Sequence, residues 1–430
     1  MSDLKANSFF RSGDIDKDYG EDGICRLHTD GFFQSMAEGK NGYQNYYYVA
    51  GFTGYRRYFL ARITADGKVD STFGSGGIIG EFTPGLSAQV FSVAVQKDGK
   101  VLVSGTENST SAALARFNMD GTPDISFGVN GVKVLDYIQD QHVDQKPSTT
   151  ESEARYAGAT GQSNMVLLPD GKILLAHSNK VEKRHQLIRL EANGNLDLSF
   201  QGTGFAEITV PEPWRMFQVT GLGIQKTGEY ERVVVCGCCN RTNEEQTDLF
   251  NAGFFKRFYL DGNEDTTFNG SGLLLAEKKN VEIWGLTIQS DGMILGVGRT
   301  RPPGFPPVPS DAPSEGVIVR LNENGALDME KYYPKSFELE WYSGSVQKDG
   351  KIVVAGIWYR EPGGTDGVVG RFHENGDADP VFGSGLDGVV RFPYRGRGER
   401  LAMQDKDFIL VGGTIYDGTD SYAAVLRFRT

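Results

Sequence analysis

The amino-acid sequence predicts an all-β protein, a seven-bladed β-propeller with four antiparallel strands in each blade. Two observations lead to this prediction: a unit of roughly sixty residues is repeated from one end of the chain to the other, and one copy of the unit is divided between the two ends. The glycine content agrees with it. Of the 430 residues, 56 are glycine, well above the usual ~7%, and all-β proteins with many tight turns need glycine.

Each repeat contains a short apolar run that carries one arginine. The first and last of these arginines, Arg62 and Arg427, are six repeats apart, which gives a period of about 61 residues. The seven runs are 60–63, 114–117, 187–190, 255–258, 318–321, 369–372 and 425–428.

A turn with glycine, then an aspartate and then an aromatic residue follow each arginine run. In the first copy the turn is Asp66-Gly67, a pair that supplies the positive φ of a tight turn, and Asp70 and Phe73 come next. In the fifth copy the aromatic residue is displaced by one position, to Tyr332. The equivalent aspartates are Asp70, Asp124, Asp197, Asp265, Asp328 and Asp379.

A β-hairpin precedes each arginine run, so each repeat provides four strands, named a, b, c and d in chain order. The clearest hairpin spans 93–105 and turns at Asp98-Gly99. Four-stranded units repeated four to eight times make a propeller. We expect a single domain over 1–430, with blades at approximately 31–82, 90–137, 161–210, 219–276, 281–340, 341–392, and 398–430 plus 13–28.

The seventh repeat is divided between the two ends of the chain. Arg427 lies in its strand c, while its turn, its aspartate and its strand d occur at the other end as Ser12-Gly13, Asp16 and 23–28. An open solenoid would not divide one repeat in this way. We therefore expect the N-terminal strand to complete the C-terminal blade and to close a ring.

These residues resemble the bacterial delta-sixty repeat family, whose units read Ala-Arg-Leu/Phe, Asp-Gly, Asp-x-x-Phe-Gly and Asp-Gly-Lys-Ile. The resemblance covers essentially the whole chain. It implies a β-propeller and no single activity, because function belongs to particular sites and not to a fold.

The composition excludes several classes of function. A net charge of −12 argues against broad nucleic-acid binding, which requires neutralisation of phosphates. No apolar stretch is long enough for a transmembrane helix, and residues 1–13 lack the apolar core of a signal peptide. Four cysteines do not make a disulfide framework in a chain of this size. We expect no cofactor, no nucleic-acid partner and no membrane insertion. We expect the protein to be located in the cytoplasm, or to be exported without a cleavable signal peptide.

No sequence motif predicts a metal site or a catalytic centre. Residues 14–18 imitate the start of a calcium-binding loop, but Tyr19 and Cys25 stand where that loop needs glycine and glutamate. Cys236 aligns with a small residue at the end of strand b in other repeats, which favours burial over metal binding. Catalytic residues therefore stay unassigned.

The two faces of the predicted disc differ in their loops. Because neighbouring strands are antiparallel, the a–b and c–d turns share one face, here called the turn face, and the b–c and d–a loops share the other, the loop face. Short Asp-Gly turns make up the turn face. The loop face carries the long insertions, among them 136–162 and 301–314. Long loops on a rigid scaffold are where function usually lies.

The loop face is also rich in aromatic residues and arginines, which recognition surfaces favour. The candidate ligand-binding residues are Tyr55, Arg57, His177, Trp214, Arg215, Arg299, Trp341, Tyr342, Trp358, Tyr359 and Arg395. The leading hypothesis is a non-enzymatic recognition or scaffold module that binds a protein or a glycan there. The alternatives are a propeller hydrolase or lyase with a polar site at the mouth of the central channel, and a structural component of a larger assembly.

The repeated arginine and aspartate are predicted to be structural partners. A catalytic residue is needed once, whereas these occur in every repeat. An arginine between apolar residues leaves water at least in part and then needs a partner. The predicted pairs are Arg62 with Asp70, Arg116 with Asp124, Arg371 with Asp379, and, across the two ends of the chain, Arg427 with Asp16.

Overall fold

The computed structural model describes residues 11–41, 44–54, 56–108, 110–135, 165–179, 183–242, 249–301, 314–333, 338–360, 363–385, 387–404 and 408–430. Over these residues it is an all-β structure with 26 strands. The helical elements among them are two single 3-10 turns, η1 (Phe268–Gly270) and η2 (Lys278–Asn280).

Four sheets contain four antiparallel strands each, in the order of the sequence. The first consists of β5 (Ala88–Val95), β6 (Val101–Glu107), β7 (Ser111–Phe117) and β8 (Val132–Leu135). The second consists of β9 (Met165–Leu167), β10 (Ile173–Asn179), β11 (Arg184–Leu190) and β12 (Phe205–Glu207). The third consists of β13 (Arg215–Thr227), β14 (Tyr230–Thr242), β15 (Leu249–Tyr259) and β16 (Leu273–Ala276). The fourth consists of β17 (Val281–Ile288), β18 (Ile294–Thr300), β19 (Gly316–Leu321) and β20 (Leu327–Tyr333).

The fifth sheet contains ten strands and brings together the two ends of the chain. Its order is β21-β22-β23-β24-β25-β26-β1-β2-β3-β4. Its C-terminal strands are β21 (Leu339–Val346), β22 (Ile352–Tyr359), β23 (Thr365–Phe372), β24 (Val389–Gln404), β25 (Phe408–Asp417) and β26 (Asp420–Arg429). Its N-terminal strands are β1 (Ile24–Asn41), β2 (Gln44–Thr53), β3 (Tyr58–Thr64) and β4 (Ile78–Gly80).

Two long strands make this sheet continuous. Strand β24 pairs with β23 through residues 389–395 and with β25 through residues 396–404. In the same way, β1 pairs with β26 through its first residues and with β2 through residues 31–41. The repeat pattern predicted a separate strand d and strand a at both places. Here strand d runs on into the following strand a.

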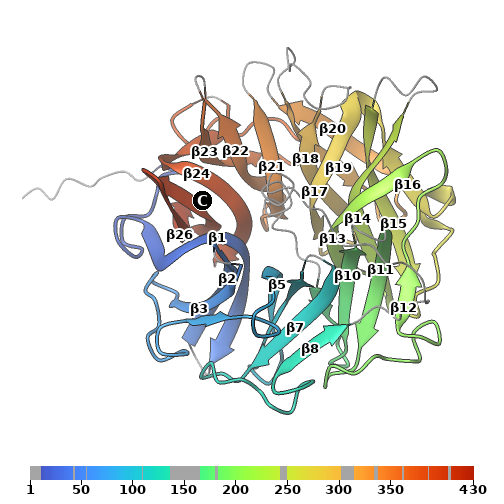
Figure 1. Ribbon diagram of the computed structural model, residues 1–430. Helices are drawn as coiled ribbons and strands as arrows, with labels where there is room; N and C mark the ends of the chain where they lie inside the picture. Colours follow the sequence, from blue (N-terminus) through green and yellow to red (C-terminus); the bar gives the residue numbers. More distant parts are fainter. Residues whose placement is uncertain are drawn as a thin grey trace, which may run out of the picture.

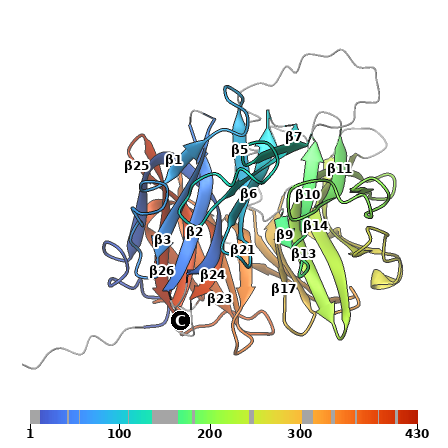
Figure 2. The ribbon, with the colours of Figure 1, turned by 90° about the horizontal axis from the view of Figure 1, so that it is seen from below.

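The sheets follow one another around a central region, in sequence order (Figure 1). The strands β1, β5, β9, β13, β17, β21 and β24 lie toward this region and are called the innermost strands. Contacts among them join β1 with β5, β5 with β9, β9 with β13, β13 with β17, β17 with β21, β21 with β24, and β24 with β1. Figure 2 gives a second view of the same sheets, with the C-terminus beside β26.

Apolar side chains fill the space between neighbouring sheets. Leu102 and Leu114 of the first sheet, for example, pack in one buried cluster with Leu175 and Ile188 of the second. The aromatic residue that ends each repeat motif is fully buried at Phe73, Phe127, Phe200, Phe268 and Phe382.

Glycine in strand b is required by a bulge in strand a. The pairing of β5 with β6 shifts between Val90 and Ser92, and a Cβ added at Gly105 would lie 1.8 Å from the Gln89 carbonyl oxygen. Gly298 stands in the same relation to the Glu282 carbonyl oxygen, also at 1.8 Å. A β-bulge bends its strand and changes the direction of the side chains around it. The innermost strands are therefore bent at equivalent positions.

The two ends of the chain together form one turn of the repeat. In the first repeat, Gly67 N–H donates to the Thr64 carbonyl at 3.0 Å. Across the ends, Gly13 N–H donates to the Arg429 carbonyl at 2.9 Å. Strand β1 then pairs antiparallel with β26, beginning with Ile24 opposite Leu426.

Candidate functional site

All seven repeat arginines contact the aspartate of their own repeat. The distance from Arg Nε to Asp Oδ2 lies between 2.5 and 2.8 Å in every case. The pairs are Arg62 with Asp70, Arg116 with Asp124, Arg189 with Asp197, Arg257 with Asp265, Arg320 with Asp328, Arg371 with Asp379, and Arg427 with Asp16.

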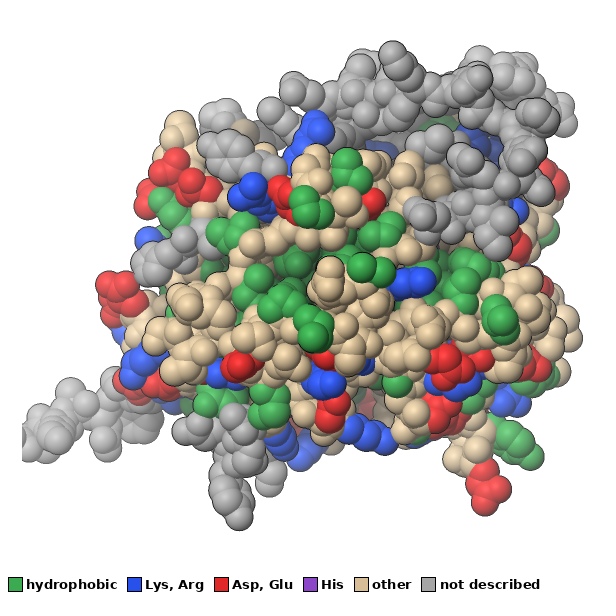
Figure 3. Space-filling view, turned by 60° about the horizontal axis from the view of Figure 1, so that its bottom comes forward, with side chains coloured by type: hydrophobic (Ala, Val, Ile, Leu, Met, Phe, Trp, Pro, Cys, Tyr) green, Lys and Arg blue, Asp and Glu red, His purple; other side chains and the backbone are tan. Residues whose placement is uncertain are grey.

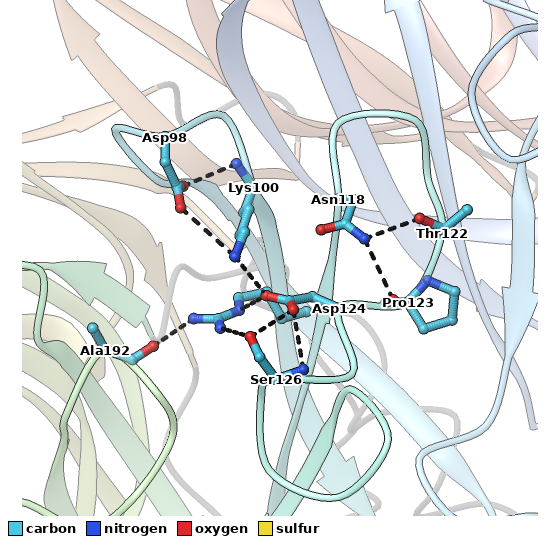
Figure 4. Close-up of polar contacts among 9 residues, drawn as sticks. Asp98, Lys100, Asn118, Thr122, Pro123, Asp124, Ser126 and Ala192 are labelled. Carbon is cyan, nitrogen blue, oxygen red and sulfur yellow. Dashed lines mark hydrogen bonds and ion pairs between the residues drawn. The ribbon is translucent and has the colours of Figure 1, made fainter.

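Figure 4 shows the environment of the second pair, at Asp124. Arg116 donates to Asp124 at 2.7 Å, to the Ser126 hydroxyl at 3.2 Å and to the Ala192 carbonyl of the next sheet at 2.5 Å. Lys100 adds an ion pair of 2.9 Å to Asp124. Burial opposes ionisation of Asp124, but the hydrogen bonds from Ser126 and Lys100 and the charge of Arg116 outweigh it, and its pKa lies well below the usual range.

The bond to the next sheet recurs and was not foreseen from the sequence. Arg62 donates to the Met119 carbonyl at 2.6 Å and Arg320 donates to the Glu374 carbonyl at 2.8 Å. Each acceptor stands three residues after the arginine of the following repeat, so an alignment of the repeats would have singled it out. Among the described residues, six of the seven repeat arginines donate to the following repeat in this way, which explains their recurrence without a catalytic role.

Most of the candidate aromatic residues of the loop face are buried. Trp341 is fully buried, Tyr342 is 4% exposed, and Trp214 and Trp358 are each 7% exposed. Trp341 packs on Phe372 with the two rings at 72°. The expectation that these side chains present an aromatic surface to a ligand is therefore corrected: they fill the space between sheets, where large apolar side chains gain most from burial.

Other candidate residues have different environments. His177 is buried, its Nε2 lies 2.8 Å from the Thr110 carbonyl, and burial lowers its pKa to about 4. Arg57 is exposed and donates to Glu81 at 2.8 Å. Arg215 is exposed at the start of β13. Tyr55 lies outside the described residues.

Arg299 belongs to a buried network of charged and phenolic groups. Its Nε donates to Glu282 at 2.8 Å, and its Nη1 pairs with Glu340. The Glu340 carboxylate also accepts hydrogen bonds from Tyr342 at 2.6 Å and from Tyr359 at 3.1 Å. Burial opposes ionisation of Glu340, but Arg299 and the tyrosines outweigh it and lower its pKa.

Glu399 in β24 interacts with Arg397 beside this network, and its pKa is shifted in the opposite direction to that of Glu340. It is 2% exposed and accepts a hydrogen bond of 3.1 Å from Thr414. Burial raises its pKa to about 8, although Arg397 favours the charged form. Glu282, Glu340 and Glu399 occupy three successive innermost strands, and sequence reasoning missed all three because single glutamates in strands carry no motif.

A pocket of about 500 Å³ opens on the loop face where the ends of β22, β23 and β25 meet β24. Two of the candidate residues, Tyr359 and Arg395, line it. Its full lining is Tyr359, Gly364, Thr365, Arg395, Tyr416 and Gly418. Tyr359 connects the pocket to the buried network through its bond to Glu340.

The turn face is also hollowed. A cavity of about 720 Å³ includes Ser12, Lys348 and Arg371 in its wall, and one of about 600 Å³ includes Lys97 and Lys226. Figure 3 shows charged side chains gathered along the lower edge of the molecule, below a band of apolar and uncharged surface. The lysines named in the smaller hollow have partners: Lys97 donates to the Pro169 carbonyl at 2.8 Å and Lys226 pairs with Glu231 at 2.6 Å.

The described residues show no cluster of histidine, cysteine and acidic side chains that could hold a metal ion. The four cysteines are buried and reduced, and burial raises the pKa of the Cys236 thiol to about 12. Over the same part of the chain, none of the helices has the length and apolar character to cross a membrane.

A family model described as "Domain of unknown function (DUF5122) beta-propeller" matches residues 47–73, 96–127, 168–200 and 347–382. Each matched segment ends at the buried aromatic residue of its repeat. Among curated proteins, none matches the sequence.

Several solved structures resemble this one at low sequence identity. A glucose dehydrogenase is 10% identical, covers 77% of this chain and 95% of its own, and has a TM-score of 0.41. BBS1N in complex with ARL6DN is 10% identical, covers 97% of this chain and 96% of its own, and has a TM-score of 0.46. AofleA from Arthrobotrys oligospora is 7% identical, covers 89% and 93%, and has a TM-score of 0.40.

Similarities at these scores carry no argument about function. The antiparallel sheets show an all-β protein, and four segments of its chain match the model of a β-propeller repeat family.

Proposed function

We propose that the chain forms one domain, a closed propeller of seven blades. Divided where β24 and β1 change partners, the ten-stranded sheet gives three four-stranded units, and the other four sheets give one unit each. The contacts among the seven innermost strands support a ring, as does the pairing of β1 with β26. The N-terminal segment then completes the last blade.

We propose that this propeller is a non-enzymatic recognition module that binds a protein or a glycan on its loop face. The observation that carries the proposal is the pocket at Tyr359, Arg395 and Tyr416. It combines aromatic walls with an exposed cation, and its size falls within the ~300–1,000 Å³ typical of ligand sites. Buried tryptophans hold the sheets around it and take no part in contact with the ligand.

A hydrolase or lyase is the second candidate, favoured by one observation. Glu340 and Glu399 lie in neighbouring innermost strands and have opposite pKa shifts, which is how enzymes separate an acid from a base. Both residues are only 2% exposed. A substrate would therefore reach them only if the strands moved, and recognition at the open pocket needs no such movement.

A glycan array and a protein pull-down test this proposal. Both are carried out with the wild-type protein and with two variants. Tyr416→Ala removes a wall of the pocket, and Lys348→Ala changes an exposed residue of the turn face. The proposal predicts that Tyr416→Ala reduces binding and Lys348→Ala leaves it unchanged. The opposite pattern contradicts a loop-face site, and conversion of a captured glycan into products favours the enzyme.

A further inference from the structure

The lining of the pocket on the loop face contains one charged side chain, the cation Arg395, in a protein whose net charge is −12. Arg395 is exposed at its edge, and within the described part of the chain no carboxylate lies within ion-pair distance of its guanidinium. Asp366 of β23 lies opposite Arg395 in the sheet and pairs through its Oδ2 with Arg360 at 2.6 Å. Arg395 is therefore available to an anion from solution.

A second arginine of β24, Arg397, lies outside the lining of the pocket but interacts with two of its tyrosines. Arg397 follows Arg395 by two positions in β24, so the two side chains leave the same side of the strand. It interacts electrostatically with both pocket tyrosines, Tyr359 and Tyr416. Its Nε is buried and has no hydrogen-bond acceptor among the residues that the structure describes.

The carboxyl group closest in sequence to Arg397 does little to neutralise the positive charge of its guanidinium. Glu399 is buried, and its pKa of about 8 keeps most of it protonated at neutral pH. Glu340 is negative, but it already accepts hydrogen bonds from Arg299 and two tyrosines. The hairpin tip beside the pocket carries exposed Asp420, which accepts a hydrogen bond from Tyr422 at 3.3 Å.

The remaining lining fits a sugar ring. Tyr359 and Tyr416 are half-buried and contribute aromatic surface, which packs against apolar ring faces and offers a hydroxyl at its tip. The Thr365 hydroxyl group can donate or accept a hydrogen bond. A carboxylate next to two guanidinium groups forms short, charge-assisted hydrogen bonds.

We infer that this pocket binds a carboxylated sugar, with the carboxylate at Arg395 and Arg397 and the sugar ring against Tyr359 and Tyr416. The inference rests on the proposed recognition function and names the ligand class of that same site. An acidic peptide is the competing ligand, and it does not use the paired aromatic walls in the same way.

The test is an array of glycans that contain uronic or sialic acids, each printed beside its carboxyl-reduced, neutral counterpart. The wild-type protein should bind at least one acidic glycan about ten-fold or more tightly than its neutral counterpart, because a charge-assisted hydrogen bond is lost on reduction. Arg395→Ala should remove this preference. Arg184→Ala, which deletes an exposed arginine elsewhere on the same face, should keep it.

Three results overturn the inference, and they separate it from the proposed function. If acidic and neutral glycans bind equally, the loop face binds glycans but does not recognise the carboxylate. Binding of acidic peptides with no acidic glycan bound leaves a recognition module with another ligand. Binding of no glycan and no protein removes both proposals. Thermal unfolding of Arg395→Ala checks that the variant folds, as expected for an exposed side chain.

Discussion

Arg427 and Asp16 stand 411 positions apart in the sequence and form a hydrogen bond of 2.7 Å between Nε and Oδ2. Arg427 also donates to the Ala65 carbonyl at 3.2 Å. Arg116 makes the same two kinds of bond, to Asp124 and to Ala192, within a continuous stretch of chain. The contacts at the ends of the chain therefore repeat those found inside it.

Removal of Asp16 should destabilise the protein. Asp16→Ala leaves the Arg427 guanidinium without its carboxylate in a site where Asp16 is 1% exposed. Breaking one side of a buried pair costs about 3–5 kcal/mol, and the free energy of unfolding, measured with urea, should fall accordingly. Asp14→Ala changes a nearby exposed aspartate and serves as the control. Equal stability of the two variants would contradict a structural role for the pair.

A lysine should not replace the repeat arginine. A single ammonium group cannot reach Asp124, Ser126 and the Ala192 carbonyl at once, as the guanidinium of Arg116 does. Arg116→Lys should lower the free energy of unfolding by about 1–3 kcal/mol, while Arg215→Lys on the surface should have no measurable effect. Wild-type stability of Arg116→Lys would show that charge alone is sufficient.

Glu399 should make stability depend on pH. Its folded pKa of about 8 exceeds the ~4.3 of an unfolded glutamate, so the folded state retains a proton that the unfolded state releases. Its contribution to stability is complete below pH ~4.3 and is lost as the pH rises through about 8. Relative to the wild type, Glu399→Gln should gain stability between pH 5 and pH 9. A difference that is constant over this range in urea unfolding would contradict the raised pKa.

Alanine should not be tolerated at the bulge glycine of strand b. In Gly298→Ala the new Cβ would meet the Glu282 carbonyl oxygen at 1.8 Å, and that backbone cannot move without disturbing β17. Thermal unfolding should show a loss of about 1–3 kcal/mol or more. Gly54→Ala adds the same atom where Gly54 has no described neighbour within 4 Å beyond the adjoining residues, so it should be neutral. An unchanged melting temperature for Gly298→Ala would refute the close contact.

The repeat made the fold predictable because its chemistry is local. Asp66-Gly67 marks a turn and the Arg62 run marks a strand wherever they occur, and their spacing gives the period. The sequence does not reveal where β24 runs on through two sheets, since the change of partner near Arg395 depends on how the sheets are placed in space.

The candidate site was predicted less well, for a physical reason. Trp341 and Tyr359 both stand near loops in the sequence, but the first is buried and the second lines the pocket. Which of them contacts solvent depends on the neighbouring sheet. Glu399 gives no signal in sequence at all, because its raised pKa comes from burial.

Amide hydrogen exchange of residues 23–28 in the wild-type protein tests most directly whether the N-terminal segment completes the last unit. Ile24 and Cys25 lie opposite Leu426 and Val425, so the account predicts protection comparable to that of β25 in the interior of the same unit, and faster exchange of residues 23–28 in Asp16→Ala. Exchange of these residues in the wild type at the rate of an unstructured peptide would contradict the closure.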